Sequence, residues 1–239
     1  MIPLEVAHAA EQLTNSEALW REVAAGAAPP TLRWYSYNRP ALVLGVGQAA
    51  SSVDEAACQV AGVEVVRRTS GGATVPADEM MLALDVALPA EHPLAGPDVL
   101  EAYRWLGETW LVALRRLVPG HAPHLHLVSV PAARADQAAQ RAARAGSPEA
   151  LRSLACFGVL SPYEVALGIG ASGGAGRDGH GDELGQRDAS GEGAASGAPL
   201  RKLVGFSQIR KRGVVMFQTG LYTRFRGSHL ARLLAVPVP

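Results

Sequence analysis

Apolar residues recur every three or four positions along two stretches of the chain, the spacing that places them on one face of an α-helix. The first stretch covers residues 8–25 and ends at a Gly/Pro-rich break. The second covers 96–117, where Asp98 is placed to cap the first turn. Shorter segments predict three further helices, over 53–62, 131–144 and 228–234.

The other apolar segments are short, are bounded by turn residues and favour β-structure. Single strands are predicted over 31–37, 41–48, 63–68 and 79–89. Residues 201–223 are expected to form a β-hairpin that turns near 211–213, and 153–167 a loop that leads into a strand. Because helices and strands mix without a regular βαβ alternation, we predict an α+β fold whose mixed, largely antiparallel sheet is flanked by helices.

One segment, residues 168–199, is dominated by Gly, Ser, Ala, Asp and Glu. Such a composition buries too little apolar surface to offset the entropy lost on ordering, so we expect a flexible insert. Strand-like sequence resumes directly after it. We therefore expect one domain over residues 1–239 that contains this insert.

Charge and cysteine content narrow the class of protein. The 22 Lys and Arg residues balance the 22 Asp and Glu residues, without the basic excess typical of nucleic-acid binding. No stretch approaches the roughly 18–20 apolar residues of a membrane span, and the N-terminus lacks the pattern of a signal peptide. The two cysteines form no CxxC pair. We expect a cytoplasmic monomer with reduced thiols and no nucleic-acid or membrane partner.

The stretch Arg67–Val75 reads RRTSGGATV and combines two guanidinium groups with a glycine-opened backbone. Backbone N–H groups and arginine forks both bind anions, so this stretch is a candidate ligand site. Neither the GxxxxGK[ST] loop nor the GxGxxG fingerprint is present. A plain hairpin turn is the alternative.

Two further candidates lie later in the chain. Lys202 begins an apolar strand whose Gly205 is typical of a close approach by a ligand or another backbone, although a lone lysine there is often a solvated rim residue. Cys156 lies in a loop-like stretch, where a nearby ammonium would favour the thiolate; a small core side chain is the alternative. Cys58 falls in a predicted helix and is expected to be structural. The seven histidines show no metal-ligand spacing.

Four segments in this order resemble a known family: TLRWYSYNRPALVLGVGQ, GVEVVRRTSGGATVPADE, CFGVLSPYEVAL and RKLVGFSQIRKRGVV. The resemblance is to the lipoate–protein ligase A, octanoyltransferase and biotin-ligase catalytic domains, and CFGVLSPYE brings the chain nearest to the cysteine-dependent, ligase-like octanoyltransferases. It covers most of residues 10–235, apart from the insert and 119–150. It implies the class II synthetase-like biotin/lipoate ligase fold.

The resemblance also implies chemistry. Cys156 would take octanoate from acyl carrier protein as a thioester and pass the octanoyl or lipoyl group to a lysine of a lipoyl domain, such as the glycine cleavage H protein or an E2 subunit. Lys202 would assist it, and no cofactor is needed. The implied substrate-binding residues are Arg67, Arg68, Ser70, Gly71, Gly72, Ala73, Thr74, Gly205, Ser207 and Gln208.

The chain departs from the family pattern at two places. A histidine is common where Ala77 stands, and a second is common where Thr219 stands. Two alternatives follow from the resemblance and these losses. One is an ATP- and Mg²⁺-dependent lipoate–protein ligase, and the other is a catalytically impaired protein that binds an acyl group or its carrier protein.

Overall fold

A seven-stranded mixed sheet is the largest element of the computed structural model, which describes residues 3–143, 154–168, 200–224, 230 and 232–234. The strand order is β1-β2-β6-β10-β9-β8-β7. Only the β1/β2 pair is parallel among the described pairs of this sheet, which confirms the predicted α+β fold. Its strands are β1 (Leu4–Ala7), β2 (Thr31–Tyr37), β6 (Met81–Pro89), β7 (Leu125–Leu127), β8 (Val165–Gly168), β9 (Leu200–Lys211) and β10 (Val214–Tyr222).

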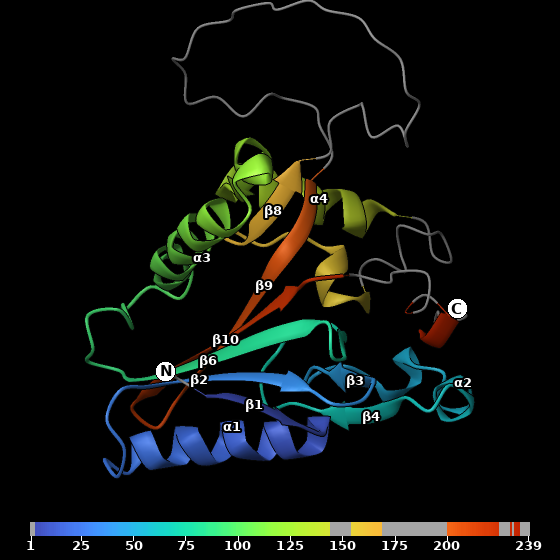
Figure 1. The fold of residues 1–239 in the computed structure, drawn as a ribbon, viewed down its shortest axis with the longest axis horizontal. Helices are drawn as coiled ribbons and strands as arrows, with labels where there is room; N and C mark the ends of the chain where they lie inside the picture. The colour runs from blue at the N-terminus through green and yellow to red at the C-terminus, as the bar shows by residue number, and fades with distance from the viewer. Residues whose placement is uncertain (1–2, 144–153, 169–199, 225–229, 231, 235–239) are drawn as a thin grey trace, which may run out of the picture.

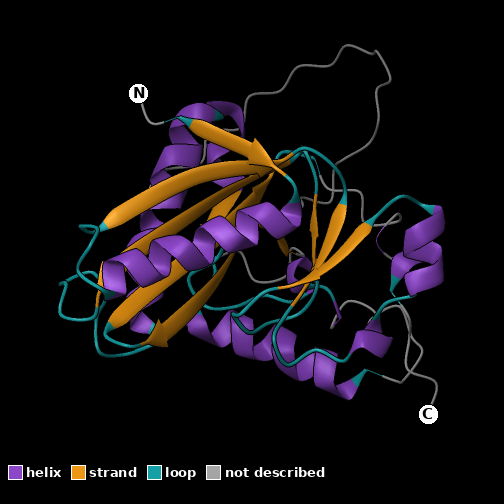
Figure 2. Cartoon of the chain, turned by 90° about the horizontal axis from the view of Figure 1, so that it is seen from below, coloured by secondary structure: helices purple, strands orange, loops and turns teal. Residues whose placement is uncertain are grey.

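A second sheet of three strands lies beside the first, and Figure 2 shows the two as separate groups. Its order is β4-β3-β5, with β3 (Ala41–Leu44) parallel to β4 (Glu64–Arg67) and antiparallel to β5 (Val75–Ala77). The residues between β4 and β5 belong to the RRTSGGATV stretch. This stretch therefore bridges two strands at opposite edges of the small sheet.

Helices cover both faces of the large sheet (Figure 1). Helix α1 (Ala9–Ala24) packs Leu19, Trp20 and Val23 against residues of β6 and β10. Helix α3 (Arg104–Leu117) lies on the opposite face. The shorter helices are α2 (Glu55–Val60), next to the small sheet, and α4 (Val130–Ala142), next to β8.

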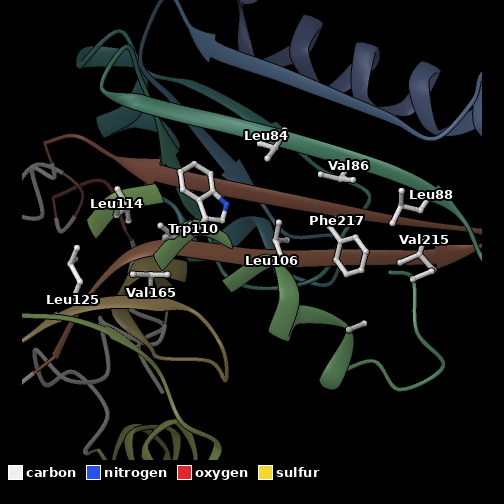
Figure 3. Packing of buried hydrophobic residues seen from close by; sticks show 13 residues of the cluster. Leu84, Val86, Leu88, Leu106, Trp110, Leu114, Leu125, Val165, Val215 and Phe217 are labelled. Atoms are coloured by element: carbon white, nitrogen blue, oxygen red, sulfur yellow. The ribbon is translucent and has the colours of Figure 1, made fainter. Parts of the chain in front are cut away.

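The largest apolar core lies between α3 and the sheet (Figure 3). Leu106, Trp110 and Leu114 recur at helical spacing and are each less than 9% exposed. They meet alternate residues of the strands, among them Val86 and Phe217. Apolar residues of this interface repeat about every 3.6 positions in the helix and every 2 positions in the strands, and these repeats are what the sequence pattern predicts for the two elements.

The hairpin prediction is confirmed in detail. Lys211 pairs with Val214, so only two residues form the turn. Both of them, Arg212 and Gly213, have positive φ angles of 49° and 73°. This is the backbone conformation that matches the twist of the paired strands in a two-residue hairpin.

Several predicted boundaries were wrong. The helix expected from residue 96 begins at Arg104. Before it, Asp98 accepts hydrogen bonds from the N–H groups of Leu100 and Glu101, and a short 3-10 turn covers Glu101–Tyr103. The strand expected over 41–48 ends at Leu44. Strands β1, β5 and β7 were missed, since three- or four-residue strands carry little periodic signal. Within the helix expected over 228–234, the described residues Leu230, Arg232 and Leu233 are helical. All of 169–199 lies outside the described residues, so the flexible insert stays a prediction.

Candidate active site

A row of three small residues and one tyrosine crosses the face of the large sheet that is turned toward the RRTSGGATV stretch. Gly205 of β9 pairs with Gly220 of β10, Gly220 with Ala83 of β6, and Ala83 with Tyr35 of β2. Cross-strand partners lie on the same face, so these four residues form a continuous strip. The strip is the floor of a pocket, which Gly205, Gly220, Tyr35 and Cys156 help to line.

A polar row runs next to this floor. Arg33 pairs with Asp85, Asp85 with Gln218, and Gln218 with Ser207. Asp85 is fully buried, and burial raises its pKa, while the hydrogen bond from Ser16 (2.5 Å) and the charge of Arg33 oppose that shift. The row therefore forms a hydrogen-bonded wall between α1 and the pocket.

The glycine loop, residues 68–74, is folded back on itself by its own arginine. Arg68 Nη2 donates to the carbonyl oxygens of Gly71 (2.7 Å) and Ala73 (3.0 Å). Gly72 has a φ of +99°, and a Cβ there would lie 2.8 Å from Arg68 Nη2. A Cβ on Gly45 would lie only 1.9 Å from the Gly72 carbonyl oxygen. Gly45 is thus required by close backbone packing, and Gly72 by its positive φ and by the Arg68 side chain beside it.

The glycine loop also fixes the backbone of Cys156. Thr74 is fully buried, its N–H donates to the Leu154 carbonyl (3.0 Å), and its own carbonyl accepts from the N–H of Cys156 (2.8 Å). The carbonyl of Cys156 accepts from Lys202 Nζ at 2.6 Å. Both backbone hydrogen-bonding groups of Cys156 are therefore held, one by the loop and the other by β9.

Lys202 is one half of a buried ion pair. Its Nζ lies 2.9 Å from Glu164 Oε1 and 2.7 Å from Oε2, and the side chains of Lys202 and Glu164 are 2% and 1% exposed. Glu164 also accepts from the backbone N–H groups of Ser161 (2.7 Å) and Phe206 (3.2 Å). Burial raises the pKa of Glu164, and the Lys202 charge opposes that shift.

A second cation lies close to Cys156. Arg68 and Cys156 line the same pocket. Burial lowers the pKa of Arg68, and the negative charge of a Cys156 thiolate is the largest effect that opposes this lowering. The Arg68 guanidinium thus interacts with the side chain of Cys156, while the Lys202 ammonium is directed at the Cys156 backbone and at Glu164.

The structure brings together most of the residues singled out from the sequence. Arg68, Cys156, Gly205 and Ser207 line the pocket. Behind them, the hydroxyl of Ser70 lies 3.4 Å from that of Ser207. Gly71, Gly72, Ala73 and Thr74 form the loop already described.

Two of the predicted site residues point elsewhere. Arg67 donates to the carbonyls of Gly45 (2.8 Å) and Gln48 (2.6 Å), so its guanidinium braces the segment after β3. Gln208 Nε2 donates to the carbonyl of Val99 at 2.6 Å, and Gln208 is not among the residues that line the pocket. The reason is the alternation of β9, which turns Gln208 to the face opposite Ser207.

Sequence reasoning missed other residues of the site. No local sequence signature identifies Tyr35, Tyr37 or Met81 as site residues. For Glu164 there was a signal, an acidic residue within an apolar, strand-like segment. The ring of Phe157 covers Gly205, where an added Cβ would meet it at 3.3 Å. These contacts join segments that are far apart in the sequence.

The two positions where family histidines are common are buried. Ala77 packs in an apolar cluster with Met81 and Tyr222. Thr219 is 4% exposed, and within the described part of the chain its hydroxyl has no hydrogen-bond partner. Among the described residues, those that line the pocket include no histidine, and no group of three or more His, Cys, Asp or Glu side chains is arranged to hold a metal ion.

Comparison with known proteins relates part of this chain to a family. The lipoyl protein ligase A/B catalytic domain matches residues 8–122. Residues 8–122 are thus similar to this catalytic-domain family, and the matched segment lies before Cys156 and Lys202 in the chain. The helices found in the described residues include none that is both long and apolar enough to cross a membrane.

Curated members similar to this chain are named octanoyltransferase LipM. The protein from Moorella thermoacetica is 28% identical over 92% of this chain and 63% of its own length. The protein from Kyrpidia tusciae is 30% identical over 87% and 60%, and that from Carboxydothermus hydrogenoformans is 38% identical over 45% and 40%. The chain thus spans less than two thirds of the length of these relatives.

Solved structures of the family share the fold. A lipoate-protein ligase A bound with ATP matches with a TM-score of 0.60 at 16% identity, over 99% of this chain and 71% of its own. An archaeal bipartite lipoate protein ligase from Thermoplasma acidophilum matches with a TM-score of 0.56 at 15% identity, over 100% and 68%.

Proposed function

We propose that this protein is an acyltransferase in which Cys156 carries an octanoyl or lipoyl group as a thioester between a carrier protein and a lipoyl-domain lysine. The observation that carries the proposal is the placement of Cys156. Its backbone is held at both ends, by Thr74 and by Lys202, and it lines a pocket together with Arg68. The named octanoyltransferase relatives support the same reaction.

The first half of the reaction loads Cys156. The thiolate attacks the carbonyl carbon of the donor thioester, a new C–S bond forms, and the donor's C–S bond breaks. The donor sulfur leaves as a thiolate and takes up a proton. Arg68 stabilises the attacking thiolate, and the ion pair of Lys202 with Glu164 holds the Cys156 backbone during attack.

The second half releases the acyl group. A neutral lysine amine of the lipoyl domain attacks the acyl thioester, an amide bond forms, and the C–S bond to Cys156 breaks. The amine loses one proton, which the departing Cys156 sulfur or solvent takes up. No redox change and no cofactor are required in either half. In this proposal acyl carrier protein is the donor and a lipoyl domain is the acceptor, and the similarity to named octanoyltransferases supports both.

Intact mass spectrometry tests the proposal. Incubation with octanoyl-acyl carrier protein is expected to add one octanoyl group to the protein, and addition of a lipoyl domain is expected to remove it. The Cys156→Ala variant is expected to gain no mass, whereas Cys58→Ser, which changes the other thiol, retains the adduct. An adduct that persists in Cys156→Ala excludes this mechanism.

The ATP-dependent ligase is the second candidate, and the fold shared with a ligase bound with ATP is what favours it. The two arginines of the RRTSGGATV stretch donate to backbone carbonyls. In the described ranges, no group of three or more His, Cys, Asp or Glu side chains is arranged to hold a metal ion. Pyrophosphate release from ATP and lipoate that is unchanged in Cys156→Ala would favour the ligase. Binding of an acyl group without transfer by either route would favour the impaired binder.

A further inference from the structure

Besides Phe157, which covers Gly205, a second side chain lies over the floor of the Cys156 pocket. Met81 belongs to β6, two residues before Ala83, and its cross-strand partner is Tyr222 of β10. Its side chain nevertheless reaches the neighbouring row, because a Cβ built on Gly220 would lie 2.0 Å from Met81 Cε. The methyl group therefore lies directly on Gly220.

Gly220 is the second position along the floor, counted from the Cys156 end. Gly205 is the first, where Phe157, the residue after Cys156, covers the backbone. Adjacent strands are about 4.8 Å apart, so the Met81 methyl stands about one strand spacing from Gly205. Beyond it, the pocket continues toward Tyr35, Leu13 and Val43. Met81 thus narrows the route from the thiol to the far end of the pocket.

The packing around Met81 allows its side chain to move, and so to widen or narrow the passage through the pocket, while the fold stays the same. Met81 is 6% exposed and packs in an apolar cluster with Tyr35, Val43 and Tyr222. The methionine side chain is unbranched and has several rotatable bonds, so its methyl group adapts to the space available. The side chain on the other side of the floor, Gln218, is tied to the polar row by its pairing with Asp85.

We propose that Met81 sets the length of the straight-chain acyl group that the Cys156 pocket accepts. This inference rests on the proposed acyltransferase function, since it assigns the substrate length of that same pocket. The Met81 methyl marks the end of the floor for shorter chains, and longer chains must displace it. Removal of the thioether lets an acyl chain continue over Gly220 toward Tyr35.

Calorimetric titration with free straight-chain acids tests the inference without turnover. Hexanoate, octanoate, decanoate and dodecanoate are titrated into the wild type, Met81→Ala and Gly220→Ala. Met81→Ala is expected to raise the affinity for dodecanoate relative to octanoate by roughly tenfold, the scale on which one or two methylenes are discriminated in an apolar pocket. Gly220→Ala is expected to shift the preference toward hexanoate, because its Cβ competes with the Met81 methyl for the same space.

Met80→Ala is the matched control, since Met80 is the neighbouring methionine and is not among the pocket-lining residues. Its order of affinities is expected to equal that of the wild type. An unchanged order in Met81→Ala, or no binding of any of the acids, overturns the inference. Acylation of Cys156 by octanoyl-acyl carrier protein is measured on the same preparations, so loss of the adduct alone rejects the transferase function and leaves the result for Met81 standing.

Discussion

Lys202 Nζ donates a hydrogen bond of 2.6 Å to the carbonyl oxygen of Cys156, a residue 46 positions away in the sequence. The same ammonium is paired with Glu164. An ammonium has three protons, and these contacts can use all of them. Lys202 therefore positions the backbone of the nucleophile, Cys156, in addition to stabilising charge.

The buried ion pair is expected to matter strongly for stability. Glu164→Gln removes the negative partner and leaves the Lys202 ammonium buried, which costs about 3 kcal/mol of the free energy of unfolding. Denaturant unfolding measures this loss. Glu17→Gln is the control, because Glu17 and Arg21 form an exposed pair and its loss is expected to change stability by less than about 0.5 kcal/mol. Equal losses of unfolding free energy in Glu164→Gln and Glu17→Gln would contradict the prediction that the buried ion pair matters strongly for stability.

The close approach of Gly45 to Gly72 predicts a sharp difference between two nearby glycines. Gly45→Ala places a Cβ against a backbone oxygen, so β3 and the glycine loop must separate, with an expected loss of about 1–3 kcal/mol. Gly47→Ala places its Cβ in open space and is expected to be tolerated. Unfolding curves and Cys156 acylation are measured for both. Retention of stability and acylation in Gly45→Ala would refute the packing argument.

The two cysteines are expected to differ in reactivity. Cys58 is 1% exposed, and burial raises the pKa of its thiol, with the charges of Asp54 and Glu55 adding to the shift. Cys156 is partly exposed and lines a pocket with Arg68. Because alkylation requires an accessible thiolate, iodoacetamide is expected to label Cys156 first in the native protein. Peptide mass mapping at several time points measures the order, and earlier labelling of Cys58 would speak against it.

Tyr37, which lines the pocket, predicts a change of stability at alkaline pH. Burial raises the pKa of Tyr37 from 10.0 to about 12. The folded state keeps this proton where the unfolded chain has lost it, so the Tyr37 contribution to stability is fully present below pH 10 and is lost as the pH rises through about 12.

Replacement of this phenol is the test. Tyr37→Phe is expected to show a shallower fall in the free energy of unfolding than the wild type between pH 10 and about 12. Tyr103→Phe provides a second case, since burial raises that pKa to about 12 as well. Denaturant unfolding at a series of pH values gives the slopes. Identical slopes in Tyr37→Phe and the wild type would show that the phenol has no such linkage.

The sequence by itself determined the elements whose signal is local. The periodic apolar faces of α1 and α3 predicted both helices, and the turn at Arg212 and Gly213 predicted the long hairpin. Such patterns are readable because they depend on residues within one or two turns or along one strand. The order of the four family-like segments likewise indicated Cys156, Lys202 and the glycine loop as parts of one site.

The tertiary structure alone decided how these parts meet. The pocket floor joins Tyr35, Ala83, Gly205 and Gly220 through strand register, and a shift of one residue would turn each side chain to the other face. Register is set by the packing of whole strands, which no short stretch of sequence contains. Arg67 and Arg68 are adjacent in the chain, but the tertiary structure directs their guanidinium groups to different backbone carbonyls. Of the two, Arg68 lines the pocket together with Cys156.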